Sequence, residues 1–171
     1  VGRGPGCPRG WTRAVNVLAL TRYGRLGASS RIRCHQYVPA LHREGIEVDV
    51  AALLPDEYVR GLNAGGRPPI WSVARWYADR LAGLIRSRRY GLLWIAHELF
   101  PGLPAIAERI LARTGPPYVV ESDDALFHRY ELNGSWLRRA VLRRKIDVVM
   151  AHAAMVIAGN DYLAARARAA G

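Results

Sequence analysis

The sequence predicts an α/β fold, namely a Rossmann-like open parallel sheet with helices on both faces. Short apolar runs alternate with helical segments along the chain, which favours right-handed βαβ units. Several of these runs end directly in polar residues, and the clearest one, YVVE at 118–121, is followed by Asp123 and Asp124. Ligands of an open parallel sheet bind beyond the carboxyl ends of its strands. The pattern therefore predicts a binding cleft along one edge of a sheet whose first strand is central.

The start of the chain predicts a strand, a helix and a second strand. The apolar run AVNVLAL at 14–20 is expected to form the first strand, and a helix should follow over residues 30–44. Gly45 should end this helix, and Pro39 should kink it because proline lacks a backbone donor. Residues 46–53 (IEVDVAAL) predict the second strand.

A long amphipathic helix is expected in the middle of the chain, over residues 70–89, after a short helix at 55–62. Its apolar face comprises Ile70, Val73, Ala74, Tyr77, Leu81, Leu84 and Ile85. Strands and helices alternate through the rest of the chain. The strands are expected at 92–96, 118–121 and 155–159, and the helices at 103–113, 136–152 and 161–170.

Length and composition predict one globular domain. The chain has 171 residues, 50% of them hydrophobic, which is enough for one sizeable core. Residues 1–13 are expected to form a disordered N-terminal arm and residues 14–171 the domain. No apolar run approaches the ~20 residues of a transmembrane helix. Cys7 and Cys34 give neither a disulfide framework nor zinc-ligand spacing, which is typical of free thiols in a reducing cytoplasm.

The formal net charge of +11 comes almost entirely from arginine, because Lys145 is the only lysine. Such a charge favours an anionic partner, or it is a solvated basic surface. Trp71 and Trp76 lie among arginines on the helix expected at 70–89. This pattern suits peripheral contact with the inner face of an anionic membrane. The alternative is that both indoles pack against a neighbouring element. No helix-turn-helix, zinc or RNP-type motif is present, so nucleic acid is not an expected partner.

The loop after the first strand, TRYGRLGASSRIR at 21–33, is a candidate anion site. Gly24 and Gly27 permit close backbone approach, and a helix N-terminus favours anions because its N–H groups are unpaired. The dinucleotide motif G-x-G-x-x-G and the P-loop motif are both absent, which disfavours nicotinamide dehydrogenases and P-loop nucleotidases. The alternative is an ordinary turn that caps the next helix.

Two further groups of polar residues follow strands. His97 could act as a general base or bind a sugar hydroxyl or phosphate, with Glu98 orienting it, or one of the two could simply cap a helix. Asp123 and Asp124 make a poor metal site, because no third oxygen ligand is nearby in sequence. They fit better as acceptors of hydrogen bonds from sugar hydroxyls, or one of them as a structural partner of Arg129.

These residues, taken in order, resemble a known family. The segment VNVLALTRYGRLGASSRIRCHQYVPALHREGIEVDV resembles the opening of bacterial group 1, family 4-like glycosyltransferases of the GT-B fold. LLWIAHELFPGLP, YVVESDDALF and MVIAGNDYLAARA follow in the order found in the N-terminal domains of that family. The resemblance covers residues 15–171. It implies that this chain is an acceptor-side N-terminal domain and that the donor-binding domain, with its E-x7-E acids, lies outside it.

The resemblance also implies roles for particular residues. Catalytic roles are expected for His97, Glu98, Asp123 and Asp124. The donor diphosphate is expected near Gly27, Ala28 and Ser29, which match the family's first loop, and near Arg31 in the first turn of the helix that follows. The acceptor is expected near Arg33, in the same turn, and near Asn160, which matches the residue that opens the last helix. The sequence departs from the family pattern at two positions. Glu121 stands where an aspartate is common, and His97 stands where a polar or basic residue, but not specifically histidine, is expected.

The expected function is the N-terminal portion of a retaining glycosyltransferase that moves a sugar from a nucleotide-sugar donor to a glycan, lipid or small-molecule acceptor. No cofactor and no metal are expected, and these residues alone should be inactive. The alternative is a non-catalytic Rossmann-like module that binds nucleotides or sugars.

Overall fold

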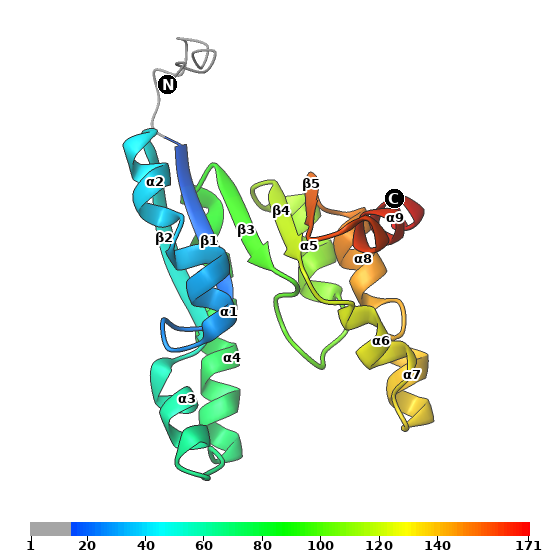
Figure 1. Cartoon of the computed structure of the whole chain (residues 1–171). Helices are drawn as coiled ribbons and strands as arrows, with labels where there is room; N and C mark the ends of the chain where they lie inside the picture. Colours follow the sequence, from blue (N-terminus) through cyan, green and yellow to red (C-terminus); the bar gives the residue numbers. More distant parts are fainter. Residues whose placement is uncertain (1–14) are drawn as a thin grey trace.

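The computed structural model describes residues 15–171, and its sheet has five parallel strands in the order β2-β1-β3-β4-β5 (Figure 1). The strands are β1 (Val15–Tyr23), β2 (Ile46–Leu54), β3 (Leu92–Ala96), β4 (Tyr118–Ser122) and β5 (Met155–Ala158). The predicted fold class is confirmed, but the middle strand of the sheet is β3, and β1 lies one place toward the edge. The predicted arm at 1–13 lies outside the described residues.

Helices cover both faces of the sheet (Figure 1). Alternation along β1 sends Val17 and Ala19 to one face and Leu18 and Leu20 to the other. The smaller cluster lies under α1 (Ala28–Ser30), the π-helix η1 (Arg31–His35) and α2 (Val38–Arg43). The main core lies under α4 (Ile70–Ile85), α5 (Ile106–Thr114), α8 (Lys145–Ala151) and α9 (Asp161–Ala170). The remaining helices are α3 (Asp56–Asn63), the 3-10 helix η2 (Arg86–Arg89), α6 (Leu126–Glu131) and α7 (Trp136–Leu142).

Two predicted helices are interrupted in the structure. The helix expected at 30–44 becomes α1 and η1, a turn at Gln36 and Tyr37, and then α2. Pro39 lies in the first turn of α2, where its missing N–H costs nothing, so it starts a new helix rather than kinking an existing one. The helix expected at 136–152 is likewise divided into α7 and α8, and α6 was not predicted.

The predicted apolar face of α4 is only partly correct. Tyr77 and Leu84 pack against the main core, but Leu81 and Ile85 are exposed. The side chain that enters the protein on this helix is Arg80, which is 5% exposed and donates hydrogen bonds to the carbonyls of Thr21 (2.6 Å) and Ala51 (3.0 Å). Burial lowers the pKa of Arg80 to about 10, so this arginine is still charged at neutral pH. It ties α4 to the ends of β1 and β2.

Cys34 is a buried free thiol in the smaller cluster, and burial raises its pKa to about 11. No helix among residues 15–171 has the length and apolar character that crossing a lipid bilayer requires.

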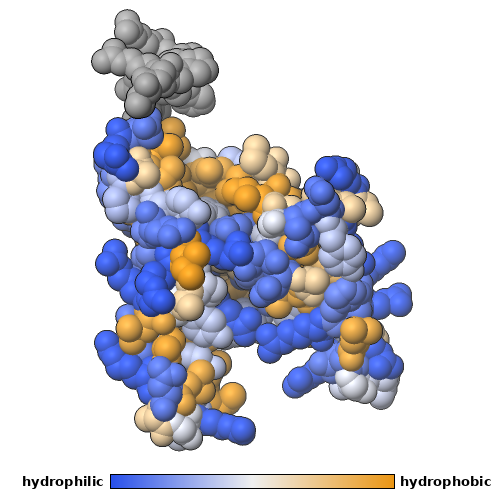
Figure 2. Space-filling model, viewed as in Figure 1, coloured by the Kyte–Doolittle hydropathy of each residue, from blue (hydrophilic) through white to orange (hydrophobic). Residues whose placement is uncertain are grey.

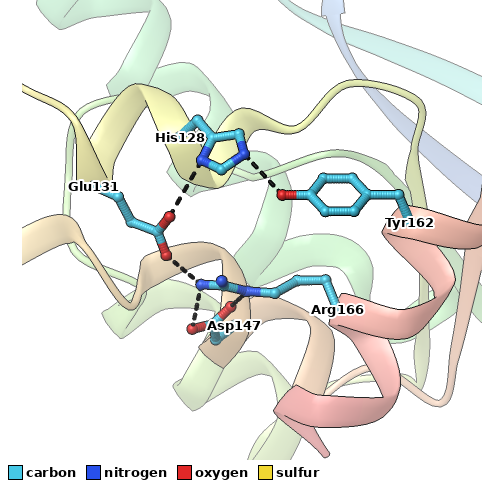
Figure 3. A network of polar contacts seen from close by, with 5 residues as sticks. All are labelled: His128, Glu131, Asp147, Tyr162 and Arg166. Carbon is cyan, nitrogen blue, oxygen red and sulfur yellow. Dashed lines mark hydrogen bonds and ion pairs between the residues drawn. The ribbon is translucent and has the colours of Figure 1, made fainter.

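A polar network joins the helices that follow β4 and β5 (Figure 3). Arg166 of α9 binds both carboxylate oxygens of Asp147 on α8, at 2.7 and 3.0 Å, and also contacts Glu131 of α6. His128 lies 3.4 Å from Glu131 and 2.8 Å from the hydroxyl of Tyr162. The guanidinium of Arg166 therefore connects three helices through charge-assisted hydrogen bonds, the strongest class in proteins.

We expect Arg166→Ala to lower the free energy of unfolding by about 1.5–3 kcal/mol, the scale of hydrogen bonds to charged groups. Arg168→Ala is the matched control, because Arg168 lies two residues along the same helix with an exposed side chain. Urea unfolding of both variants measures the difference. Equal stability of the two variants would mean that the network contributes nothing.

Candidate functional site

The carboxyl ends of β1, β3 and β4 surround a small pocket of about 140 Å³. Its polar lining comes from strands and loops far apart in sequence and includes Thr21, Arg22, Ser29, Ser30, Arg33, His97, Glu121 and Asp124. Hydrophilic residues gather around this edge, between α1 and α6 (Figure 2). The α3–α4 turn and α7 project beyond the same edge on either side (Figure 1). The sheet thus brings together the polar groups that the sequence placed after separate strands.

Arg33 organises the acids of this edge. Its guanidinium lies 3.0 Å from Glu121 and 2.5 Å from Asp123, and the indole of Trp94 donates a hydrogen bond of 3.2 Å to Glu121. The π-helical turn of η1 carries Arg33 over the sheet toward β4. Arg33 was predicted to bind the acceptor, and the structure places it in ion pairs within the protein. Arg129, the predicted partner of these aspartates, is exposed on α6 instead.

His97 has an unusual backbone and a buried ring. Its φ of 65° is the only positive value at a non-glycine residue in the described part of the chain. Such a conformation is uncommon and concentrates at functional sites. Nε2 lies 2.8 Å from the Asp123 carboxylate, whereas Nδ1 is buried without a hydrogen-bond partner within residues 15–171. The ring is therefore held beside an acid, and its second nitrogen is enclosed by the protein without a polar partner among the described residues.

Burial lowers the pKa of His97 below its ordinary value of 6.5, and this effect outweighs the opposite effect of the neighbouring Asp123 carboxylate. The neutral imidazole therefore predominates at neutral pH. Arg33 also lowers this pKa.

We expect Arg33→Gln to raise the pKa of His97, because the variant removes a cation and leaves the acids unpaired. NMR titration of the His97 ring nitrogens measures the shift, with Arg113→Gln as a control far from the site. A His97 pKa that is unchanged in Arg33→Gln would contradict the arrangement.

In the wild type the pKa of His97 is lower in the folded state than in the unfolded state, so His97 should stabilise the fold above about pH 6.5 and lose this contribution as the pH falls.

The glycine loop after β1 is packed closely against its surroundings. The backbone N–H of Leu26 donates to Asp56 at 2.9 Å, and that of Gly24 to the Leu54 carbonyl at 3.1 Å. A Cβ on Gly27 would lie 2.3 Å from the Cβ of Tyr23. The φ of Gly27 is −71°, which any residue adopts. Close approach of Tyr23, and not backbone strain, therefore explains this glycine.

We expect Gly27→Ala to lower the free energy of unfolding by about 1–3 kcal/mol, because Tyr23 must shift to admit the methyl group. Gly61→Ala is the matched control, since nothing lies within 4 Å of a Cβ built there. On α3 it should instead stabilise the protein by about 0.5–1 kcal/mol. Chemical unfolding of both variants tests the pair, and a neutral Gly27→Ala would contradict the packing argument.

Glu98 does not contribute a free carboxylate to the pocket. It is 5% exposed, accepts hydrogen bonds from the Tyr130 hydroxyl at 2.8 and 2.9 Å, and lies 2.5 Å from the ammonium of Lys145. Lys145 also donates to the carbonyl of Phe100. Sequence reasoning missed Lys145 and Tyr130 as partners; the one lysine in an arginine-rich chain was the available signal. We therefore regard Glu98 as a positioning residue for the loop that carries His97.

The other predicted residues lie at the rim. Ala28, Ser29 and Arg31 are exposed near the first loop, so their predicted contact with a diphosphate stays a prediction. Asn160 caps α9 by accepting a hydrogen bond of 2.9 Å from the Leu163 amide. Its predicted contact with the acceptor therefore competes with a structural role.

One cluster of side chains at this edge meets the distance requirement of a metal site, but one of its ligands is already paired. His97, Asp123 and Asp124 can each place one ligand atom within 4.8 Å of the others. Asp123 is already paired with Arg33, and a guanidinium beside a ligand disfavours a cation. The expectation of metal-independent chemistry stays a prediction.

Two of the larger hollows, with volumes of about 800 and 820 Å³, lie away from this edge. The first lies between β2 and α4, and the second between α7, α8 and α9. Neither includes the residues that gather after β3 and β4. We place the candidate site at the smaller pocket, because that is where the buried histidine and the paired acids converge.

Comparison with known proteins gives the family. A family model described as a glycosyl transferase 4-like domain matches residues 9–171. The chain belongs to this family. The resemblance noted from the sequence is thereby confirmed, and the candidate pocket lies in a glycosyltransferase-type domain.

Other comparisons add little. Among curated proteins, none matches this glycosyltransferase-type domain. Among solved structures, the X-ray structure of an oxidoreductase from Corynebacterium diphtheriae is 14% identical, with a TM-score of 0.37, and the match covers 93% of this chain and 94% of that one. This likeness is too weak to inform either the fold or the function.

Proposed function

We propose that this chain is the acceptor-side domain of a retaining glycosyltransferase. The enzyme would transfer a sugar from a nucleotide-sugar donor to a glycan, lipid or small-molecule acceptor. The observation that carries the proposal is that a domain of this family gathers Ser29, His97 and Asp124 around one pocket at the carboxyl edge of its sheet. Ligands of open α/β sheets bind at this edge.

The pocket offers groups suited to sugar hydroxyls. The low pKa of His97 keeps its imidazole neutral, so one ring nitrogen carries a proton and the other carries a lone pair. Asp123 fixes the ring from one side, and Arg33 in turn fixes Asp123. Asp124 is exposed and can accept hydrogen bonds directly. Groups held in advance in this way stabilise a transition state at little cost of reorganisation.

The donor half of the reaction would come from outside residues 1–171. In this proposal a second domain binds the nucleotide, while the loop at Gly27 and Arg31 approaches the diphosphate. Closure of the two domains would exclude water and bring donor and acceptor together. These residues alone would therefore hold an acceptor weakly and transfer nothing.

The test measures sugar transfer by the enzyme that contains this chain and its donor domain. Asp123→Asn should lower kcat by about 100-fold or more, the scale of a misplaced acid–base group. Asp79→Asn, an exposed change on α4, should leave kcat unaltered. Wild-type kcat in Asp123→Asn, or transfer by residues 1–171 alone, would overturn the proposal. Binding of nucleotide sugars without transfer in the longer protein would instead favour the alternative, a non-catalytic binding module.

A further inference from the structure

One helix presents its apolar stripe to solvent. Trp71, Ala74, Ala78, Leu81 and Ile85 are spaced alternately three and four residues apart on α4, and all are exposed. The exposed fractions are 72% for Trp71, 52% for Leu81 and 73% for Ile85. Residues with this spacing lie along one side of a helix, and in a globular protein that side normally faces the core. On α4 it faces outward.

The outward orientation is fixed by what α4 buries on its other side. Arg80 is bound to the carbonyls of Thr21 and Ala51, and the Tyr77 hydroxyl donates a hydrogen bond of 2.8 Å to the Pro101 carbonyl. Rotating the helix to bury Leu81 and Ile85 would break these bonds. The exposure of the stripe therefore follows from the fold and is not a matter of side-chain conformation.

The stripe continues onto α5. Leu81, Leu84 and Ile85 line a groove of about 420 Å³ together with Ala107, Ile110 and Leu111 of α5. Ile106 and Ile110 lie one turn apart on α5 and are 61% and 56% exposed. The two helices thus share one apolar surface, which we call the α4–α5 surface.

Charge on and around the α4–α5 surface is one-sided. Its exposed arginines are Arg67, Arg75, Arg86, Arg88, Arg89, Arg109 and Arg113. Asp79 is the only acid in the sequence between Glu57 and Glu98, and Glu108, the only acid between Glu98 and Glu121, is fully buried. An apolar stripe bordered by arginines, with a tryptophan near one end, is the pattern of a helix that lies in the interface of an anionic bilayer.

We propose that the α4–α5 surface binds an anionic lipid bilayer, with α4 lying in the plane of the interface. The apolar side chains would enter the acyl boundary while the arginines contact lipid phosphates. A second copy of the chain is a poorer occupant, because self-association would bring two arginine borders together. This inference does not depend on the proposed sugar transfer, since lipid binding is measured without any donor or acceptor.

The experiment measures co-sedimentation of the enzyme containing this chain with vesicles of phosphatidylcholine, with or without 30 mol% phosphatidylglycerol. We expect binding to the anionic vesicles only, weakened by salt because surface charges are screened. Ile85→Asp should weaken binding by about tenfold or more, since it removes a large exposed apolar side chain that would enter the bilayer and adds a negative charge. Leu132→Asp is the matched control, because Leu132 is 77% exposed on a different element.

Tryptophan fluorescence supplies a second readout. The emission of Trp71 should shift to shorter wavelength on anionic vesicles, and this shift should disappear in Trp71→Phe. The absence of binding, or an equal loss in Leu132→Asp, would overturn the assignment of this surface. A dimer that Ile85→Asp dissociates, without any vesicle binding, would show that the surface joins two copies and would likewise overturn the proposal.

Discussion

The arrangement of the candidate site depends on one buried ion pair, between Glu98 and Lys145. Both side chains are almost completely removed from solvent, at 2% and 0% exposure, and a buried charge is tolerated only when it is paired and hydrogen-bonded. The Tyr130 hydroxyl also donates hydrogen bonds to Glu98, and the Lys145 ammonium donates one to the carbonyl of Phe100. The pair therefore fixes the loop after β3 against α6 and α8. His97 adopts its left-handed backbone at the start of that loop, next to the fixed glutamate.

The sequence predicted the sheet well, because parallel strands buried on both faces read as short apolar runs that end in polar residues. It also predicted that the polar loops after these strands, which carry Ser29, Glu98 and Asp123, would lie along one edge of the sheet. The breaks at Gln36 and after Leu142 were not predicted, because helical periodicity continues across them. The partnership of Arg33 with Glu121 could not be predicted either, since it spans 88 residues and depends on how η1 lies over the sheet.

The side of α4 that is buried could not be predicted from the sequence pattern either. Its hydrophobic pattern identified the helix correctly but not the side that it buries. The competing interaction is the pair of hydrogen bonds that the Arg80 guanidinium donates to the carbonyls of Thr21 and Ala51. Hydrogen bonding of buried backbone thus decided the orientation of the helix, and the apolar residues took the remaining side. Periodicity alone carries no information about such a choice.

Arg33 connects the two sides of the pocket, which are the glycine loop and the acids beside His97. It belongs to the same helical turn that begins at the glycine loop, and its guanidinium ends on the acids beside His97. Any ligand that moves this turn changes the electrostatic field at the imidazole. The proton affinity of His97 would then report whether a ligand occupies the loop on the other side of the pocket.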